Sequence, residues 1–204
     1  LHDYACDRGS ITAYSILCVC RQGIFPAKAM QKRLIDKVII VRRAPGAPTR
    51  GILAAGPLAI RCALGRTGIT TRKREGDGAT PLASMRLLSA FRRKGRLAGL
   101  HPALPQHWTR PFDGWCDAPA HAAYNRPVRL PFPASAETLQ RADRLYDFGV
   151  VTDFNMTRRK RAGGSAIFLH IARAGYAPTE GCVAVSPADM MRLRPWLRRG
   201  TRLI

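Results

Sequence analysis

The hydrophobic positions from Lys37 onward fall in short runs that glycine and proline residues separate. β-Branched and aliphatic residues dominate these runs, and a sustained helical period is absent from them. Short apolar runs bounded by turn residues are typical of buried β-strands. The pattern predicts a mostly β fold, either a sandwich or barrel with one or two short helices or an α+β fold dominated by sheet. We expect strands at 38–41, 51–54, 58–64, 85–91, 150–155, 167–171, 182–185 and 202–204.

Two segments carry the signals of a helix start. Ser135 can cap a short helix over 136–143. Ser186 precedes Pro187 and stands three residues before Asp189, which resembles a capping box with proline at the first helical position. We expect this second helix to run from Pro187 to about Leu197, with Gly200 ending it.

The chain divides at Lys37, where the strand pattern begins. We expect an N-terminal extension over residues 1–36, disordered or weakly signal-like, followed by one catalytic domain over 37–204. The apolar stretch 11–20 and the sequence Ala27-Lys28-Ala29 are compatible with a signal peptide. Acidic residues precede that stretch and Arg21 follows it, which argues against an export signal.

Composition limits the class of partner. The 204 residues are 46% hydrophobic, which suits a globular core, and no apolar run approaches the roughly 20 residues of a membrane span. The formal net charge of +21 favours polyanionic partners, among them nucleic acid, an anionic membrane surface or an anionic cell-wall polymer. The sequence has no phosphate-binding loop of the G-x-x-x-x-G-K-[ST] type and no suitably placed carboxylate pair for glycoside hydrolysis.

The six cysteines show no C-x-x-C spacing, so we expect neither a zinc site nor another bound metal or cofactor. Cys182 is the candidate nucleophile, because His170 lies in an apolar strand that one short loop joins to the cysteine. A lone cysteine in an apolar run is more often a small core residue, and Cys62 and Cys116 fit that interpretation.

These residues predict acyl transfer. His170 would take the proton of Cys182, and the thiolate would attack a carbonyl. Gly181 permits a sharp turn whose backbone N–H groups could form an oxyanion hole.

Residues 92–134 form a long segment rich in Pro, His and Trp between the two halves of the strand pattern. It contains the sequences 113–117 and 124–127, which combine aromatic, amide and acidic side chains. Tyr124 and Asn125 are our candidate substrate-binding residues. The alternative is a loop that packs its own aromatic side chains over a sheet edge.

Two motifs carry a resemblance to a known family. His170 followed by Thr179-x-Gly181-Cys182-Val183 resembles the H…[ST]-x-G-C-[IV] signature of the L,D-transpeptidase (YkuD-type) family. The upstream segment 77–82, Asp-Gly-Ala-Thr-Pro-Leu, resembles that family's D-G-x-T-P-x-G segment, in the same chain order. The resemblance that these two motifs indicate extends over residues 37–204.

The resemblance implies a mostly β L,D-transpeptidase fold whose cysteine acts on peptidoglycan stem peptides in the bacterial periplasm or cell envelope. Such enzymes cleave the bond before the terminal D-Ala of a tetrapeptide and pass the acyl group to an amine. In the family a nearby backbone carbonyl orients the histidine, which here would belong to Ile171. Three positions depart from the pattern and indicate a divergent member: Ile171 and Ala83 replace glycines, and Ala184 replaces an arginine.

Two alternatives stay open from the sequence. Water could be the acceptor, which would make the protein a peptidoglycan amidase or carboxypeptidase. A different class is a basic nucleic-acid-binding module with a structural Cys182, although the sequence contains no helix-turn-helix or ribonucleoprotein-like motif, and we expect no nucleic-acid partner.

Overall fold

The computed structural model describes residues 37–204, and the expected extension over residues 1–36 lies outside them. Helix α2 covers Pro187–Arg192, and two short 3-10 turns, η1 and η2, cover Ala174–Tyr176 and Arg194–Trp196. The strands are β1 (Val38–Ala44), β2 (Ala47–Ala55), β3 (Leu58–Ala63), β4 (Ile69–Thr70), β5 (Thr80–Pro81), β6 (Met85–Arg92), β7 (Gln106–Trp108), β8 (Asp113–Cys116), β9 (Arg126–Arg129), β10 (Ala136–Thr138), β11 (Phe148–Thr152), β12 (Phe168–Ile171), β13 (Val183–Val185) and β14 (Arg202–Leu203).

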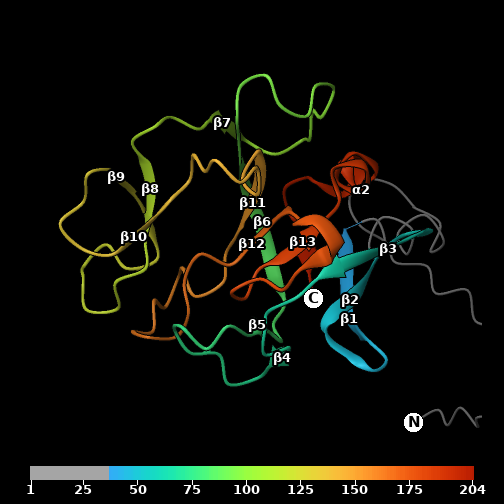
Figure 1. Ribbon diagram of the computed structural model, residues 1–204, viewed down its shortest axis with the longest axis horizontal. Helices are drawn as coiled ribbons and strands as arrows, with labels where there is room; N and C mark the ends of the chain where they lie inside the picture. The colour runs from blue at the N-terminus through green and yellow to red at the C-terminus, as the bar shows by residue number, and fades with distance from the viewer. Residues whose placement is uncertain (1–36) are drawn as a thin grey trace, which may run out of the picture. The chain divides into compact units, whose positions relative to one another are not determined.

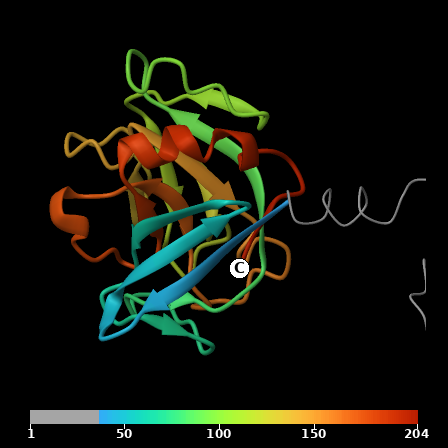
Figure 2. The same ribbon diagram turned by 90° about the vertical axis from the view of Figure 1, so that its right-hand side faces the viewer.

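The main sheet closes on itself. Its strand order is β11-β12-β13-β3-β2-β1-β14-β6-β7, and β11 also pairs with β6. Figure 1 and Figure 2 show the long β1–β2 hairpin on one side of β13 and α2 beside the same sheet. The expected mostly β fold of the sandwich or barrel type is therefore confirmed, with one short α-helix in the described residues.

Two hydrophobic clusters occupy the two faces of β6, β11 and β12. Leu169 and Val150 belong to the larger cluster, to which strands from all around the closed sheet contribute. Phe168 and Val151, their neighbours in sequence, belong to a second cluster on the other face. Because successive strand residues alternate between faces, a strand buried on both sides needs a continuous apolar run. This explains why residues 167–171 carry no polar side chain except His170.

A small sheet, β10-β8-β9, lies to one side of β11 and β12 (Figure 1), and its strand β8 contributes Trp115 to the second cluster. The ring of Trp115 in β8 packs edge-on against Phe168, with 5.1 Å between the ring centroids. Phe168 also contacts Phe91 in the same T-shaped arrangement. The long segment rich in Pro, His and Trp thus folds into a lid of irregular structure and short strands over one face of β12.

Gly149 permits this packing. It pairs with Phe91 on one side and with His170 on the other. A Cβ at Gly149 would lie 2.1 Å from Phe91 Cζ, so any larger residue would displace that ring.

The expected helices were less accurate than the strands. The helix over 136–143 is wrong, because Ala136, Glu137 and Thr138 instead form β10 and pair with β8. Helix α2 ends at Arg192 rather than Leu197. Pro195 disfavours helical geometry at the residue before it and cannot donate a backbone hydrogen bond, so the chain continues as the η2 turn. No helix among residues 37–204 has the length and apolar character needed to cross a membrane.

We expect Leu169→Ala to lower the free energy of unfolding by about 2–5 kcal/mol, because Leu169 is fully buried in the larger cluster. Leu82→Ala, at a side chain that is 58% exposed, is the matched control and should change stability by less than about 1 kcal/mol. Urea unfolding of the full chain measures both. Equal losses in the two variants would contradict the assignment of the core.

Candidate active site

The parallel pairing of β12 with β13 brings His170 and Cys182 together. Leu169 pairs with Val183 and His170 with Ala184, so Cys182 lies beside Phe168 at the start of the ladder. Residues two apart on a strand share a face, which places the side chains of Cys182, Phe168 and His170 on the same side. Cys182 and His170 line one pocket of about 360 Å³.

Residue Cys182 is 8% exposed, and its thiol both donates and accepts a hydrogen bond. It donates to the carbonyl of Ala166 at 3.1 Å and accepts from the backbone N–H of Phe168 at 3.2 Å. Among the described residues, the thiol forms no hydrogen bond to the imidazole of His170. The sulfur is therefore held in the pocket by backbone groups of the β12 segment.

The imidazole of His170 is fixed by its own strand. Its Nδ1 lies 2.9 Å from the carbonyl oxygen of Ile171, so a neutral ring with hydrogen on Nδ1 leaves Nε2 as the acceptor. The ring of Tyr146 packs edge-on against it, with 5.3 Å between centroids. Burial lowers the pKa of His170 to about 4, because the surroundings disfavour the charged form, although the bond to Ile171 opposes this shift.

Burial also raises the pKa of Cys182 to about 12. The negative charge of Glu137 adds to this rise, whereas the N–H of Phe168 and the ammonium of Lys73 oppose it. Both members of the pair are thus neutral around pH 7 in the resting protein. A preformed thiolate–imidazolium pair is not favoured in this state.

Gly181 adopts a backbone that few other residues tolerate, with φ at +132°. A Cβ at this position would lie 2.7 Å from the carbonyl oxygen of Ala79. Its N–H donates to Thr179 Oγ1 at 3.2 Å, and the Thr179 hydroxyl donates to the carbonyl of Cys182 at 2.7 Å. The Thr-x-Gly-Cys sequence therefore forms a tight turn that closes on itself.

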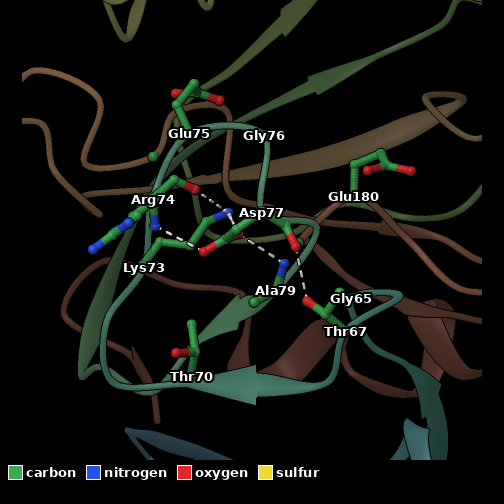
Figure 3. A network of polar contacts seen from close by, with 12 residues as sticks. Gly65, Thr67, Thr70, Lys73, Arg74, Glu75, Gly76, Asp77, Ala79 and Glu180 are labelled. Atoms are coloured by element: carbon green, nitrogen blue, oxygen red, sulfur yellow. Dashed lines mark hydrogen bonds and ion pairs between the residues drawn. The ribbon is translucent and has the colours of Figure 1, made fainter.

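The segment over 77–82 packs against this turn. The side chain of Thr80 is buried; its oxygen accepts from the N–H of Gly65 at 2.8 Å, and its hydroxyl lies 3.4 Å from the carbonyl of Cys182. The carboxylate of Asp77 accepts from the N–H groups of Ala79 and Arg74, at 2.8 and 2.7 Å (Figure 3). The two motifs that the sequence singled out thus lie against each other.

The remaining pocket wall is strongly charged, and sequence reasoning did not identify it. Acidic side chains outnumber basic ones there, in a protein whose net charge is +21. Glu137 accepts a hydrogen bond from the hydroxyl of Tyr146 at 2.8 Å and forms an ion pair with Arg141. The charged side chains of the pocket are Glu75, Asp117, Glu137, Arg141, Arg173 and Glu180.

Tyr124 and Asn125, the candidate substrate-binding residues, lie behind the pocket wall rather than among its lining residues. The hydroxyl of Tyr124 donates to Glu75, which does line the pocket. Asn125 is almost fully buried: its Oδ1 accepts from the indole N–H of Trp115 and from the N–H of Ala166, and its Nδ2 donates to the carbonyl of Phe154.

Two of the three positions that depart from the motif, Ile171 and Ala184, are buried. Ala184 is fully buried between β12 and β3, paired with His170 and Ala63. Ile171 points its side chain into the larger hydrophobic cluster. Residues 37–204 contain no cluster of His, Cys, Asp and Glu that could hold a metal ion.

Comparison with protein families identifies the domain to which these residues belong. The family model of the L,D-transpeptidase catalytic domain, YkuD, matches residues 50–204, which is more than half of the chain. The chain belongs to the L,D-transpeptidase family. No curated protein and no solved structure matches the sequence. The family consists of cysteine-dependent transpeptidases that act on peptidoglycan peptides and is typically found in the cell envelope.

In this L,D-transpeptidase domain, Asn125 joins the lid to the strand segment that holds the thiol. We expect Asn125→Ala to lower the free energy of unfolding by about 2 kcal/mol or more, because it leaves the buried N–H groups of Trp115 and Ala166 unpaired. Thr157→Ala, at an exposed position, is the control. Thermal unfolding compares them, and indistinguishable midpoints would count against this role.

Proposed function

We propose that the protein is a cysteine acyltransferase that cross-links or remodels peptidoglycan stem peptides. The observation that carries the proposal is the placement of Cys182 and His170 on one face of adjoining strands, lining one pocket, in a chain of the L,D-transpeptidase family. Cys182 is the proposed nucleophile and His170 the proposed general base. The carbonyl of Ile171, 2.9 Å from Nδ1, is the proposed group that orients the imidazole.

The first half-reaction forms a thioester. The thiol turns from the carbonyl of Ala166 toward the imidazole, and Nε2 of His170 takes its proton. The sulfur attacks the carbonyl carbon of the bond before the terminal D-Ala, giving a tetrahedral oxyanion. The C–N bond then breaks, and the D-Ala amine leaves with the proton that His170 held.

The backbone of the Gly181–Cys182 step is the proposed oxyanion hole. The N–H of Gly181 donates to Thr179 in the resting protein, so the substrate oxygen would have to displace that hydroxyl. A donor in this position is worth about 3 kcal/mol of transition-state stabilisation.

The second half-reaction transfers the acyl group. An amine of another stem peptide attacks the thioester and gives its proton to His170, and the thiolate leaves and is reprotonated. The acidic side chains of the pocket favour an acceptor that arrives as an ammonium group, since opposite charges attract within a partly buried site, and this group loses one proton to solvent before its amine attacks. The net charge of +21 supports a further attraction to anionic cell-wall polymers, and with these partners the protein would act in the bacterial periplasm or cell envelope.

The direct test is incubation of the purified full chain with a disaccharide tetrapeptide. We expect mass spectrometry to detect free D-Ala and a cross-linked dimer with the wild type and neither product with Cys182→Ala. Cys62→Ala, at a buried cysteine outside the pocket, is the matched control and should keep activity if it folds. Activity that survives in Cys182→Ala would refute the proposal. Release of D-Ala with a hydrolysed stem in place of a dimer would identify water as the acceptor.

The proton affinities of the pair predict the pH dependence of thiol reactivity. The pKa of Cys182 is about 12, so at any pH below that value the thiolate fraction increases about tenfold when the pH is raised by one unit. We expect the alkylation rate of Cys182 by iodoacetamide, measured on its peptide by mass spectrometry, to keep rising from pH 7 to pH 10. A plateau near the free-thiol value of about 8.5 would contradict this prediction.

A further inference from the structure

Lys73 is a buried cation near the proposed nucleophile. Its side chain is 6% exposed, and its Nζ donates to the carbonyl of Arg74 at 3.0 Å and to the carboxylate of Asp77. Figure 3 shows the ammonium enclosed by the loop that these residues form. An ammonium leaves water at a high cost unless it is paired, and the loop supplies the acceptors that pair with the buried Lys73 side chain.

Two glycines make room for this side chain. A Cβ at Gly164, where φ is +95°, would lie 2.9 Å from Lys73 Cγ and 3.0 Å from its Cε. A Cβ at Gly181 would lie 3.4 Å from Lys73 Nζ. The lysine therefore crosses Gly164 and ends beside the Gly181–Cys182 step, where a side chain on either glycine would crowd it.

We propose that the Lys73 ammonium, held beside Gly181 by Asp77, stabilises the negative charge that develops at the Cys182 step. This inference rests on the proposed function, since it needs Cys182 to react as a thiolate. Lys73 is a positioning residue in this proposal, because it acts through the field at Cys182 and does not touch the substrate. The carboxylate of Asp77 holds the ammonium in place, and its negative charge partly offsets the positive charge that Cys182 experiences.

The charges around Cys182 explain why such a cation matters. Burial and the carboxylate of Glu137 both raise the pKa of the thiol, and Lys73 is the charged side chain that lowers it. His170 is neutral in the resting protein, so it adds no positive charge before it accepts the proton. Tyr146 is also neutral, because burial raises the pKa of its hydroxyl. The other charged groups of the pocket are Glu75, Asp117, Arg141, Arg173 and Glu180.

The competing interpretation is that the Lys73–Asp77 pair only braces the loop over 73–79. The pair does hold the loop: the pKa of Asp77 is lowered, since the bonds from Lys73, Ala79 and Arg74 outweigh the opposing effect of burial. A brace is weakened by removal of either partner, so both variants would then shift Cys182 reactivity in the same direction. An electrostatic role predicts different responses, because one variant removes a positive charge and the other a negative charge.

The experiment compares Lys73→Met and Asp77→Asn in the full chain by the pH profile of Cys182 alkylation. Iodoacetamide is the probe, and mass spectrometry follows the peptide that contains Cys182. We expect Lys73→Met to react about tenfold more slowly than the wild type at a fixed pH, and Asp77→Asn to react at least as fast as the wild type. Lys73→Arg should restore most of the rate, and Lys94→Met, at an exposed lysine, is the matched control.

The inference is overturned if Lys73→Met reacts within a factor of two of the wild type, or if Asp77→Asn slows together with it. If Lys73→Met does not fold, Asp77→Asn and Lys73→Arg decide, because the brace predicts slower alkylation in Asp77→Asn. Release of D-Ala by the wild type, measured in parallel, separates the two proposals. Failure of that reaction rejects the proposed function, whereas an active wild type with unchanged Lys73→Met rejects the role of Lys73 alone.

Discussion

The parallel ladder between β12 and β13 is the interaction on which the site depends. Parallel strands need a crossover, and here the crossover is the short segment that contains η1 and the Thr179–Cys182 turn. The ladder is held in place because β12 also pairs with β11, and β13 also pairs with β3, inside a closed sheet. The backbone of Cys182 cannot shift relative to that of His170 unless the hydrogen bonds between these paired strands also change.

The sequence was most informative where local pattern and tertiary structure coincide. Short β-branched runs between glycines and prolines located most main-sheet strands, and the spacing of His170 and Cys182 predicted their meeting. The helix over 136–143 failed because Ala136–Thr138 completes a sheet with β8, a partner about twenty residues away that no local signal reveals. Tyr146, Glu137 and Lys73 were missed for a related reason: they come from separate segments, and only the folded structure brings the first two into the pocket and Lys73 next to Gly181.

The charges in the pocket differ in sign from the net charge of the chain, which the amino-acid composition alone does not reveal. The net charge of the chain is strongly positive, yet acidic side chains outnumber basic ones in the pocket wall, and the buried Lys73 lies beside Gly181. The proposed attraction to a polyanion uses the net charge of the chain, whereas the proposed selection of an ammonium group uses the acidic side chains of the pocket, which act within the screening length of about 8–10 Å. Net charge describes the first role, and only the local arrangement describes the second.

The proposed nucleophile is a buried, neutral thiol in the resting protein, and this state affects how readily the sulfur is oxidised. A thiolate attacks oxidants and disulfides as a nucleophile, so a thiol with a pKa of about 12, which ionises little at neutral pH, reacts slowly with both. The cell envelope, where this family is typically found, is an oxidising compartment that converts exposed thiols to disulfides. In the proposed mechanism, the burial that slows the ionisation of Cys182 therefore also protects its thiol from oxidation between turnovers.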